Sequence, residues 1–374
     1  MRKKKIIFIM NNFWIGGTEK FLLGLIAEFC RTNEVHIATV LGGGPLEPEF
    51  KKMPVSIFHA SPVIFANKRL PLKLFWLLAA PVTLIRLLIF LLKVKPDAVI
   101  SSLYQSDILG MSAAHLSGVK KRILVQHDIQ KFGFLRKYFK SLFALHRATS
   151  IIAVSDSVRG FLVSYWRVPV EKITVIPDAI NFENFASAVK PLDKKNITFG
   201  IIGRLEPVKG HRCFLEALAI LKEKYKIEPK VIVAGGGPIE KDLKVYREAN
   251  SLNKVEFWGP VLDAREFFRQ VDVAVFPSLE EGFGLVVLEA LAAKKLVVAS
   301  AIGSFREIIQ PGSNGILFPV DDREALAAVL KSLLDEPDRI EKYKTNLALW
   351  FEQVGYKYDL GRAKDQYEKL FAIL

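Results

Sequence analysis

Short apolar runs bounded by turn residues alternate with longer segments of helical periodicity along most of this 374-residue chain. This alternation is typical of parallel sheets whose strands are joined by crossover helices. It occurs in two series, which predict strands over residues 5–10, 35–40, 98–101, 123–126 and 151–154, and again over residues 198–202, 230–234, 254–258, 271–276 and 296–300. We therefore predict an α/β protein made of two doubly wound halves.

A polar stretch with Pro191 separates the two series. Because one hydrophobic core rarely extends through a chain of this length, we place a domain boundary there. The predicted domains are residues 1–185 and 190–350. The last segment, 351–374, is helical by pattern, and we expect it either to finish the second domain or to pack back on the first.

The basic charge of the chain is confined to its first half. Residues 1–180 hold 25 Lys and Arg against 11 Asp and Glu, so the entire net charge of +14 lies there. A nucleic-acid binder is not expected to segregate its charge in this way, whereas a domain attracted to anionic lipid or phosphate is. We predict an anionic membrane surface as a partner and no nucleic acid, with a charge that serves only solubility as the alternative.

Residues 70–92 are almost entirely apolar, and only Lys73 and Arg86 carry charge within them. The run is long enough for a transmembrane helix, but Pro81 and Arg86 inside it argue against spanning. Basic residues at both ends favour a helix that lies in the membrane interface. We predict interfacial insertion, with burial inside the domain and spanning as alternatives.

Several other site types lack their motifs. Cys30 and Cys213 match no metal or redox spacing. No G-x-G-x-x-G follows the first strand and no P-loop occurs, so NAD binding and ATP hydrolysis are not indicated. The basic N-terminus precedes only five apolar residues, which favours a buried first strand in a cytoplasmic protein over a signal peptide.

The most informative run reads strand, loop and helix over residues 271–291. Its loop delivers backbone N–H groups at a helix N-terminus, a ready site for phosphate, from Gly282, Phe283, Gly284 and Leu285. Glu281 opens the loop and Glu289 lies inside the helix. Because carboxylates accept hydrogen bonds from hydroxyls, one carboxylate can face a sugar while the other reaches a pair of hydroxyls further along the same ligand.

This pattern resembles the signature of retaining glycosyltransferases of the GT-B fold, particularly glycosyltransferase family 4. Other marks of the family recur in order along the whole chain: Gly16, Gly17, Thr18 and Glu19; Gly203, Arg204 and Leu205 with Lys209 and Gly210; Gly235, Gly236, Gly237 and Pro238; and Gly303, Ser304 and Glu307. The resemblance implies two Rossmann-like domains that face each other across a cleft. The first binds the acceptor and the second the nucleotide sugar.

The resemblance also implies a role for each donor-binding residue. Arg204 and Lys209 match residues that bind the donor diphosphate, where they stabilise leaving-group charge without a metal. Glu281 is expected to contact the transferred sugar and Glu289 the ribose hydroxyls. Two further sets complete the donor site: the glycine turn of Gly16 and Gly17, where backbone approaches the donor, and the base pocket around Gly259 and Val261.

His127 follows a strand in the first half and matches a histidine that lies near the transferred sugar in relatives; an ordinary core or surface histidine is the alternative. The resemblance implies a front-face reaction with retention of configuration, in which a departing phosphate oxygen helps to deprotonate the acceptor. The predicted catalytic residues are Glu281, His127, Arg204 and Lys209, with no metal and no cofactor. The nucleotide sugar is a substrate.

Two positions depart from the family pattern. Asp178 and Asn181 follow a strand that we predict over residues 173–176, and they are exchanged in character relative to many relatives, so we expect a different hinge turn there. Glu280 adds a charge beside Glu281, and we expect it to be turned away from the diphosphate.

The sequence thus predicts a hexosyltransferase that moves a hexose or N-acetylhexosamine from a nucleotide-diphosphate sugar, with UDP preferred by family frequency. The predicted acceptor is a glycan or lipid-linked saccharide of surface polysaccharide synthesis, at the cytoplasmic face of a membrane. One alternative is a nucleotide-sugar 2-epimerase of the same fold, which needs no acceptor. The other is a membrane-bound sugar-binding scaffold without catalysis.

Overall fold

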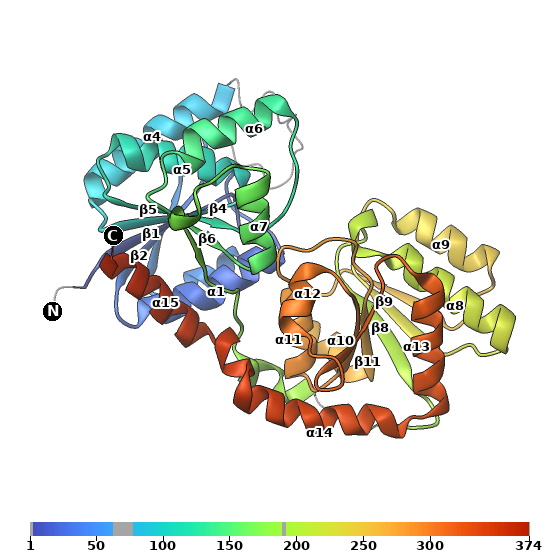
Figure 1. Ribbon diagram of the computed structural model, residues 1–374. Helices are drawn as coiled ribbons and strands as arrows, with labels where there is room; N and C mark the ends of the chain where they lie inside the picture. Colours follow the sequence, from blue (N-terminus) through green and yellow to red (C-terminus); the bar gives the residue numbers. More distant parts are fainter. Residues whose placement is uncertain (1–2, 63–77, 189–191, 374) are drawn as a thin grey trace. The chain divides into compact units, whose positions relative to one another are not determined.

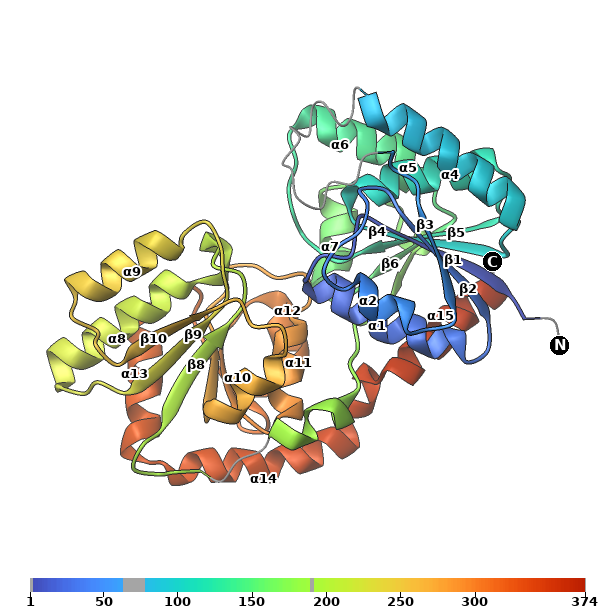
Figure 2. The ribbon, with the colours of Figure 1, turned by 180° about the vertical axis from the view of Figure 1, so that it is seen from behind.

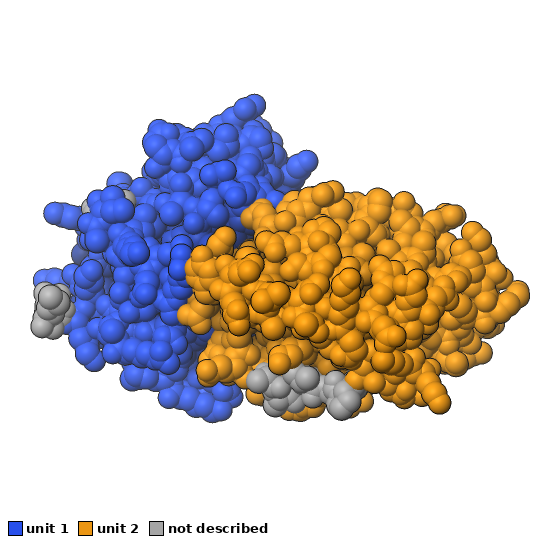
Figure 3. Space-filling view, turned by 60° about the horizontal axis from the view of Figure 1, so that its bottom comes forward, with its two compact units in different colours: residues 1–179, 360–374 blue, residues 180–359 orange. Residues whose placement is uncertain are grey.

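The computed structural model describes residues 3–62, 78–188 and 192–373, which form two compact units (Figure 3). Unit 1 comprises residues 1–179 and 360–374, and unit 2 comprises residues 180–359. The division at residue 180 lies five residues before the end of the predicted first domain. The segment that joins unit 1 from the C-terminus begins at Leu360, nine residues after the predicted start at 351.

Unit 1 is built on a seven-stranded parallel sheet in the order β3-β2-β1-β4-β5-β6-β7. Its strands are β1 Lys5–Met10, β2 Glu34–Thr39, β3 Val55–His59, β4 Ala98–Ser102, β5 Lys121–Gln126, β6 Ser150–Ala153 and β7 Ile173–Val175. The central strands are buried on both faces, as continuous apolar runs such as residues 6–10 require. Of the strands described here, only β3 was not anticipated in any form.

Helices cover both faces of this sheet (Figures 1 and 2). One face carries α4 Ala80–Val94, α5 Tyr104–Leu116 and α6 Phe134–Lys140, and the other carries α1 Gly17–Cys30 and the C-terminal α15 Leu360–Ile373. The remaining elements are α2 Glu47–Lys51, η2 Ser141–Leu145, α7 Asp156–Ser164 and η3 Val170–Lys172. Helix α15 packs on α1 through Phe29, whose ring lies 6.2 Å from Tyr367 and 6.0 Å from Phe371.

Unit 2 is a six-stranded parallel sheet in the order β10-β9-β8-β11-β12-β13. Its strands are β8 Thr198–Ile202, β9 Lys230–Ala234, β10 Val255–Gly259, β11 Val273–Phe276, β12 Leu296–Ser300 and β13 Gly315–Phe318. Its helices are η4 Phe182–Ala188, η5 Pro207–Lys209, α8 His211–Tyr225, α9 Glu240–Ala249, α10 Ala264–Gln270, α11 Leu285–Ala292, α12 Gly303–Ile308, α13 Arg323–Asp335, α14 Asp338–Gln353 and η6 Gly355–Tyr358. The prediction of two doubly wound halves is confirmed.

The apolar segment predicted at residues 70–92 falls partly outside the described residues, because residues 63–77 are not described. Its described part enters α4. One face of this helix, with Thr83, Leu87 and Leu91, is buried against unit 1. The opposite face exposes an apolar stripe at helical spacing, formed by Val82, Ile85, Ile89 and Leu92. Among the helices that the structure describes, none is both long and apolar enough to cross a bilayer.

Candidate active site

In each unit the strand order reverses at one point, and loops that follow the strands on either side diverge there. Open α/β sheets bind ligands in the crevice at this point, outside the carboxyl ends of the strands. In unit 2 the point lies between β8 and β11. The loop after β8 carries Arg204 and Lys209, and the loop after β11 carries Glu281 and leads into α11. The topology therefore brings the residues that are predicted to bind the diphosphate and the sugar to one edge of one sheet.

Lys209 and Glu281 meet at this edge. The Lys209 ammonium lies 2.6 Å from Oε1 of Glu281, and the Ser278 hydroxyl donates to the same oxygen at 2.9 Å. Both ionic side chains are largely buried, with exposed fractions of 22% and 14%. The pair holds a cation in the loop that leads into α11, and the N-terminus of a helix carries positive potential.

Two glycines allow the loops after β8 and β11 to pack closely. Gly210 has φ +70°, and a Cβ placed there would lie 1.8 Å from the carbonyl oxygen of Pro277. The loop after β8 is thereby pressed against the loop after β11, with the Leu279 amide donating to the Val208 carbonyl at 2.8 Å. Gly284, the N-cap of α11, has φ +105°, and a Cβ there would collide with Phe305. Only glycine avoids strain at both positions.

The other predicted residues of unit 2 are distributed around this edge. Arg204 is 67% exposed and pairs with Glu206 at 2.8 Å, so its side chain is not joined to the pair of Lys209 and Glu281. Glu280 is exposed, and its orientation relative to a diphosphate stays a prediction. Glu289 is half-buried in α11. Gly282, Phe283 and Leu285 are buried in the loop and first turn.

The predicted base pocket follows β10. Gly259 has φ +74°, and its carbonyl accepts from the Gly235 amide at 2.7 Å. Gly235 in turn lies so close to the Gly203 carbonyl that a Cβ would sit 1.8 Å from it. The glycine turns after β8, β9 and β10 are therefore packed backbone against backbone, and Val261 follows them half-buried.

In unit 1 the order reverses between β1 and β4. Gly16 is the N-cap of α1 after β1, and Gly17 is the first residue of this helix. A Cβ on Gly16 would lie 2.4 Å from a carboxylate oxygen at the movable end of the Glu19 side chain, so this contact alone does not require glycine here. Asn11, which sequence reasoning did not single out, joins the two strand ends by bonds to Gln105 and to the Ser106 amide, at 2.8 and 2.9 Å.

His127 lies at the carboxyl end of β5 and is paired with Asp178, which follows β7. Nδ1 of His127 lies 3.2 Å from Oδ2 of Asp178, and the two side chains are only 4% and 5% exposed. Phe21 of α1 packs edge-on against the imidazole at 5.9 Å. Burial acts to lower the pKa of His127, but the carboxylates of Asp178, Asp128 and Asp107 raise it, and the net shift is upward.

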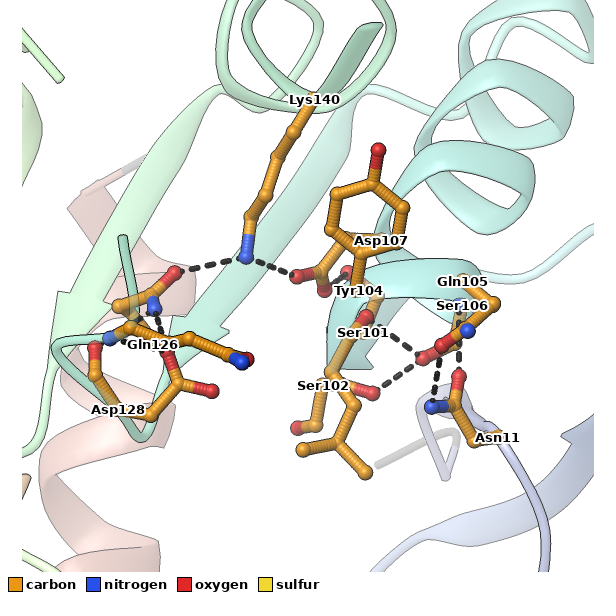
Figure 4. Close-up of polar contacts among 12 residues, drawn as sticks. Asn11, Ser101, Ser102, Tyr104, Gln105, Ser106, Asp107, Gln126, Asp128 and Lys140 are labelled. Carbon is orange, nitrogen blue, oxygen red and sulfur yellow. Dashed lines mark hydrogen bonds and ion pairs between the residues drawn. The ribbon is translucent and has the colours of Figure 1, made fainter. Parts of the chain in front are cut away.

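A buried polar network beside His127 was not predicted (Figure 4). Lys140 of α6 is 3% exposed and forms an ion pair of 3.0 Å with Asp107 of α5, which is fully buried. The ammonium also donates to Oε1 of Gln126 at 2.9 Å, and Nε2 of Gln126 donates to Asp128 at 2.8 Å. The network thus connects α6 to the two residues that flank His127.

Metal ligation has no candidate among residues 3–62, 78–188 and 192–373, where no group of three or more His, Cys, Asp or Glu side chains could hold an ion. Metal independence itself stays a prediction.

The fold and the site define a class. The protein has two doubly wound units, and one of them presents a cation and a helix N-terminus at the point where the strand order of its sheet reverses, its switch point. This is the architecture of nucleotide-binding proteins of the GT-B type. The model of the group 1 glycosyl transferases matches residues 182–350, and that of glycosyltransferase family 4 matches residues 15–184. The chain belongs to this family of glycosyltransferases, and the predicted resemblance is confirmed.

Individual relatives agree with this assignment. The chain is 24% identical over 98% of both lengths to the GalNAc-α-(1→4)-GalNAc-α-(1→3)-diNAcBac-PP-undecaprenol α-1,4-N-acetyl-D-galactosaminyltransferase of Campylobacter jejuni. It is 30% identical to the D-inositol 3-phosphate glycosyltransferase of an Arthrobacter species over 64% of its residues, and spans 63% of that protein's length. The crystal structure of Anabaena HepE in complex with UDP-glucose superposes with a TM-score of 0.82 at 19% identity, over 99% of this chain and all of the other.

Proposed function

We propose that this protein is a retaining glycosyltransferase that transfers a hexose or N-acetylhexosamine from a UDP-sugar to a glycan or lipid-linked acceptor in surface polysaccharide synthesis. It works at the cytoplasmic face of a membrane. The observation that carries the proposal is the pair of Lys209 and Glu281 beside the N-terminus of α11. A diphosphate suits the cation and the helix end, and a sugar hydroxyl suits the carboxylate. The UDP-glucose bound to HepE and the undecaprenol-linked substrate of the Campylobacter jejuni relative support these choices.

For retention we propose the front-face reaction that the family resemblance implies, because Glu281 is a poor candidate for a covalent nucleophile. Its Oε1 already accepts from Lys209 and Ser278, and a carboxylate oxygen with two donors is a weak nucleophile. We therefore assign Glu281 to orientation of the sugar rather than to a covalent intermediate. Lys209, aided by Arg204, stabilises the charge of the departing diphosphate, and no metal takes part.

Membrane association is supported by a surface on unit 1 that we name the lipid face. It consists of the apolar stripe of α4 and the exposed apolar residues of α6 and η2, which are Phe134, Leu135, Tyr138, Phe139 and Leu142. Both helices pack on α5, on the same side of the sheet. Exposed Arg86, Lys93, Lys131 and Arg136 lie on or next to these helices. Apolar side chains with basic neighbours match an anionic bilayer surface.

Donor binding is tested by calorimetric titration of the full chain with a panel of nucleotide sugars. We expect a UDP-sugar to bind, and Lys209→Met to weaken its binding by about tenfold or more because a charge-assisted contact is lost. Lys244→Met is the matched control, since Lys244 pairs with Glu240 on the surface of α9. Equal weakening in both variants, or none in either, contradicts the site.

Transfer is tested by incubating the protein with the bound donor, with and without lipid-linked acceptors. The α-linked product of an α-linked donor establishes retention. Inversion at C2 of the donor sugar without any acceptor would instead identify the protein as a 2-epimerase. Donor binding without either reaction would favour the sugar-binding scaffold.

The lipid face is tested with vesicles of equal parts phosphatidylglycerol and phosphatidylcholine. We expect the protein to sediment with them at low salt and to be released at high salt, because screening weakens surface charge attraction. The double variant Ile85→Ser/Ile89→Ser is expected to lose binding, as is Phe134→Ser/Leu135→Ser. The control Val245→Ser/Leu262→Ser changes exposed apolar residues of unit 2. Equal binding by all three variants would refute the lipid face.

A further inference from the structure

The hydrogen bond between His127 and Asp178 determines which ring nitrogen of His127 carries a proton. A carboxylate can only accept hydrogen bonds, so the proton between the two groups must sit on Nδ1 of His127. The other ring nitrogen, Nε2, is buried and has no hydrogen-bond partner among the described residues. A buried polar atom without a partner is costly, and each one calls for an explanation such as a bound ligand or water. Nε2 is therefore available to a ligand.

We propose that Asp178 is a positioning residue that keeps His127 charged, so that Nε2–H donates a hydrogen bond to an oxygen of the bound donor or acceptor. This inference rests on the proposed function. It separates two roles that a histidine at this place can take, since Nε2 of an imidazolium donates, whereas Nε2 of a neutral imidazole with its proton on Nδ1 accepts. Under our proposal His127 is not the base that deprotonates the acceptor.

The charges around His127 favour the donating form. Asp178 faces it from the segment after β7, Asp128 lies next to it in the chain, and Asp107 of α5 acts from further away and is paired with Lys140. Phe21 of α1 contributes no charge. These carboxylates outweigh burial in setting the direction of the pKa shift of His127, which is upward.

The C-terminal helix supplies a further titratable group near the pair. Tyr367 of α15 is fully buried, and its hydroxyl has no partner among the described residues. Burial raises the pKa of Tyr367 well above its ordinary value, and the charge of Asp178 adds to the rise. The phenol therefore stays neutral and adds no charge that would compete with His127 for Asp178.

The charge of Asp178 can be separated from its hydrogen bond by substitution. Asn can accept from Nδ1 but cannot stabilise a cation on the ring. Asp178→Asn is thus a nearly isosteric variant that keeps the orientation of His127 and removes the charge. Asp178→Ala removes both.

The proton state of His127 can be measured directly and without substrate. Carbon-labelled histidine resolves the six histidines of the full chain by NMR, and His127→Gln identifies the resonance. We expect Asp178→Asn to move the titration of His127 to lower pH. Asp156→Asn is the control, because Asp156 is an exposed residue of α7 that pairs with Arg159 at 2.8 Å. An unchanged titration in Asp178→Asn would overturn the proposal.

The pH dependence of transfer supplies the second readout. We expect kcat/KM of the unaltered protein to fall as pH rises through the pKa of His127, because Nε2 then loses the proton that it donates. In Asp178→Asn this fall should occur at lower pH, with a loss of about tenfold at pH 8 relative to the unaltered protein. A rate that instead rises through the pKa of His127 would identify a base and overturn the proposal. A shifted titration in a protein that transfers no sugar would refute the proposed function alone.

Discussion

Removal of the Lys140 ammonium should be among the most damaging single changes in unit 1. Lys140→Met keeps the length of the side chain but leaves the Asp107 carboxylate, which is fully buried, without its cation at 3.0 Å. Breaking a buried pair by removing one partner costs about 3–5 kcal/mol, because the remaining charge is not compensated. For a domain of this size each kcal/mol lowers Tm by about 2–4 °C, so we expect a fall of at least about 6 °C.

The cost should also depend on pH in a defined direction. Burial raises the pKa of Asp107, and Lys140 is the main group that opposes this rise. Without Lys140, Asp107 of the folded protein keeps its proton at pH values at which Asp107 of the unfolded chain has already lost it. Stability of the variant should therefore decrease as pH rises above the pKa of an unfolded Asp, and the deficit should be larger at pH 8 than at pH 5.

Differential scanning calorimetry of three variants measures this effect. Lys140→Met should show the full loss, and the double variant Asp107→Asn/Lys140→Met should regain most of it, because Asn keeps the hydrogen bond from Ser101 at 2.8 Å and carries no charge. Lys93→Met, at the exposed C-terminal end of α4, is the control. A loss below about 1 kcal/mol, as for a surface pair, would refute the reasoning.

Three further changes have defined outcomes. Gly210→Ala should cost at least about 1 kcal/mol in urea unfolding and weaken UDP-sugar binding, because its Cβ meets the Pro277 carbonyl; an unaltered affinity would contradict the contact between the two loops. Phe371→Ala should lower stability by about 3–5 kcal/mol, since the ring is buried against Phe29, and a neutral result would show that α15 is not part of unit 1. Burial, with a smaller effect of Lys209, lowers the pKa of His211 to about 4, so the unfolded state binds the extra proton and stability should fall by about 3 kcal/mol as pH drops from about 6.5 to 4. His211→Leu should flatten that part of the stability profile measured by urea unfolding, and an unchanged slope would rule out His211 as its cause.

The strands that surround both switch points could be predicted from sequence because their apolar runs are local features. Residues 198–202, for example, were placed with the bounds that the structure shows. Two edge strands were missed for physical reasons. Strand β3 is exposed or half-buried at every position, and only two of the four residues of β13 are buried, so neither shows the continuous buried run of the central strands.

The candidate site was predictable only where a local motif carries it. Glu281 and the loop that follows lie in one run of sequence, whereas the partner of His127 is 51 residues away. Lys140 lies in a basic, aromatic helix, where a lysine is ordinarily solvated. Its burial depends on Asp107, 33 positions earlier, and no spacing in the chain indicates that contact. Long-range ion pairs of this kind are decided by packing rather than by local pattern.

The most direct test is a crystal structure of the full chain with a UDP-sugar. The account predicts phosphate oxygens within about 3 Å of Nζ of Lys209 and of the backbone N–H groups that begin α11, with a sugar hydroxyl donating to Glu281. A nucleotide bound elsewhere, with Lys209 still held by Glu281 and no phosphate beside either, would contradict it.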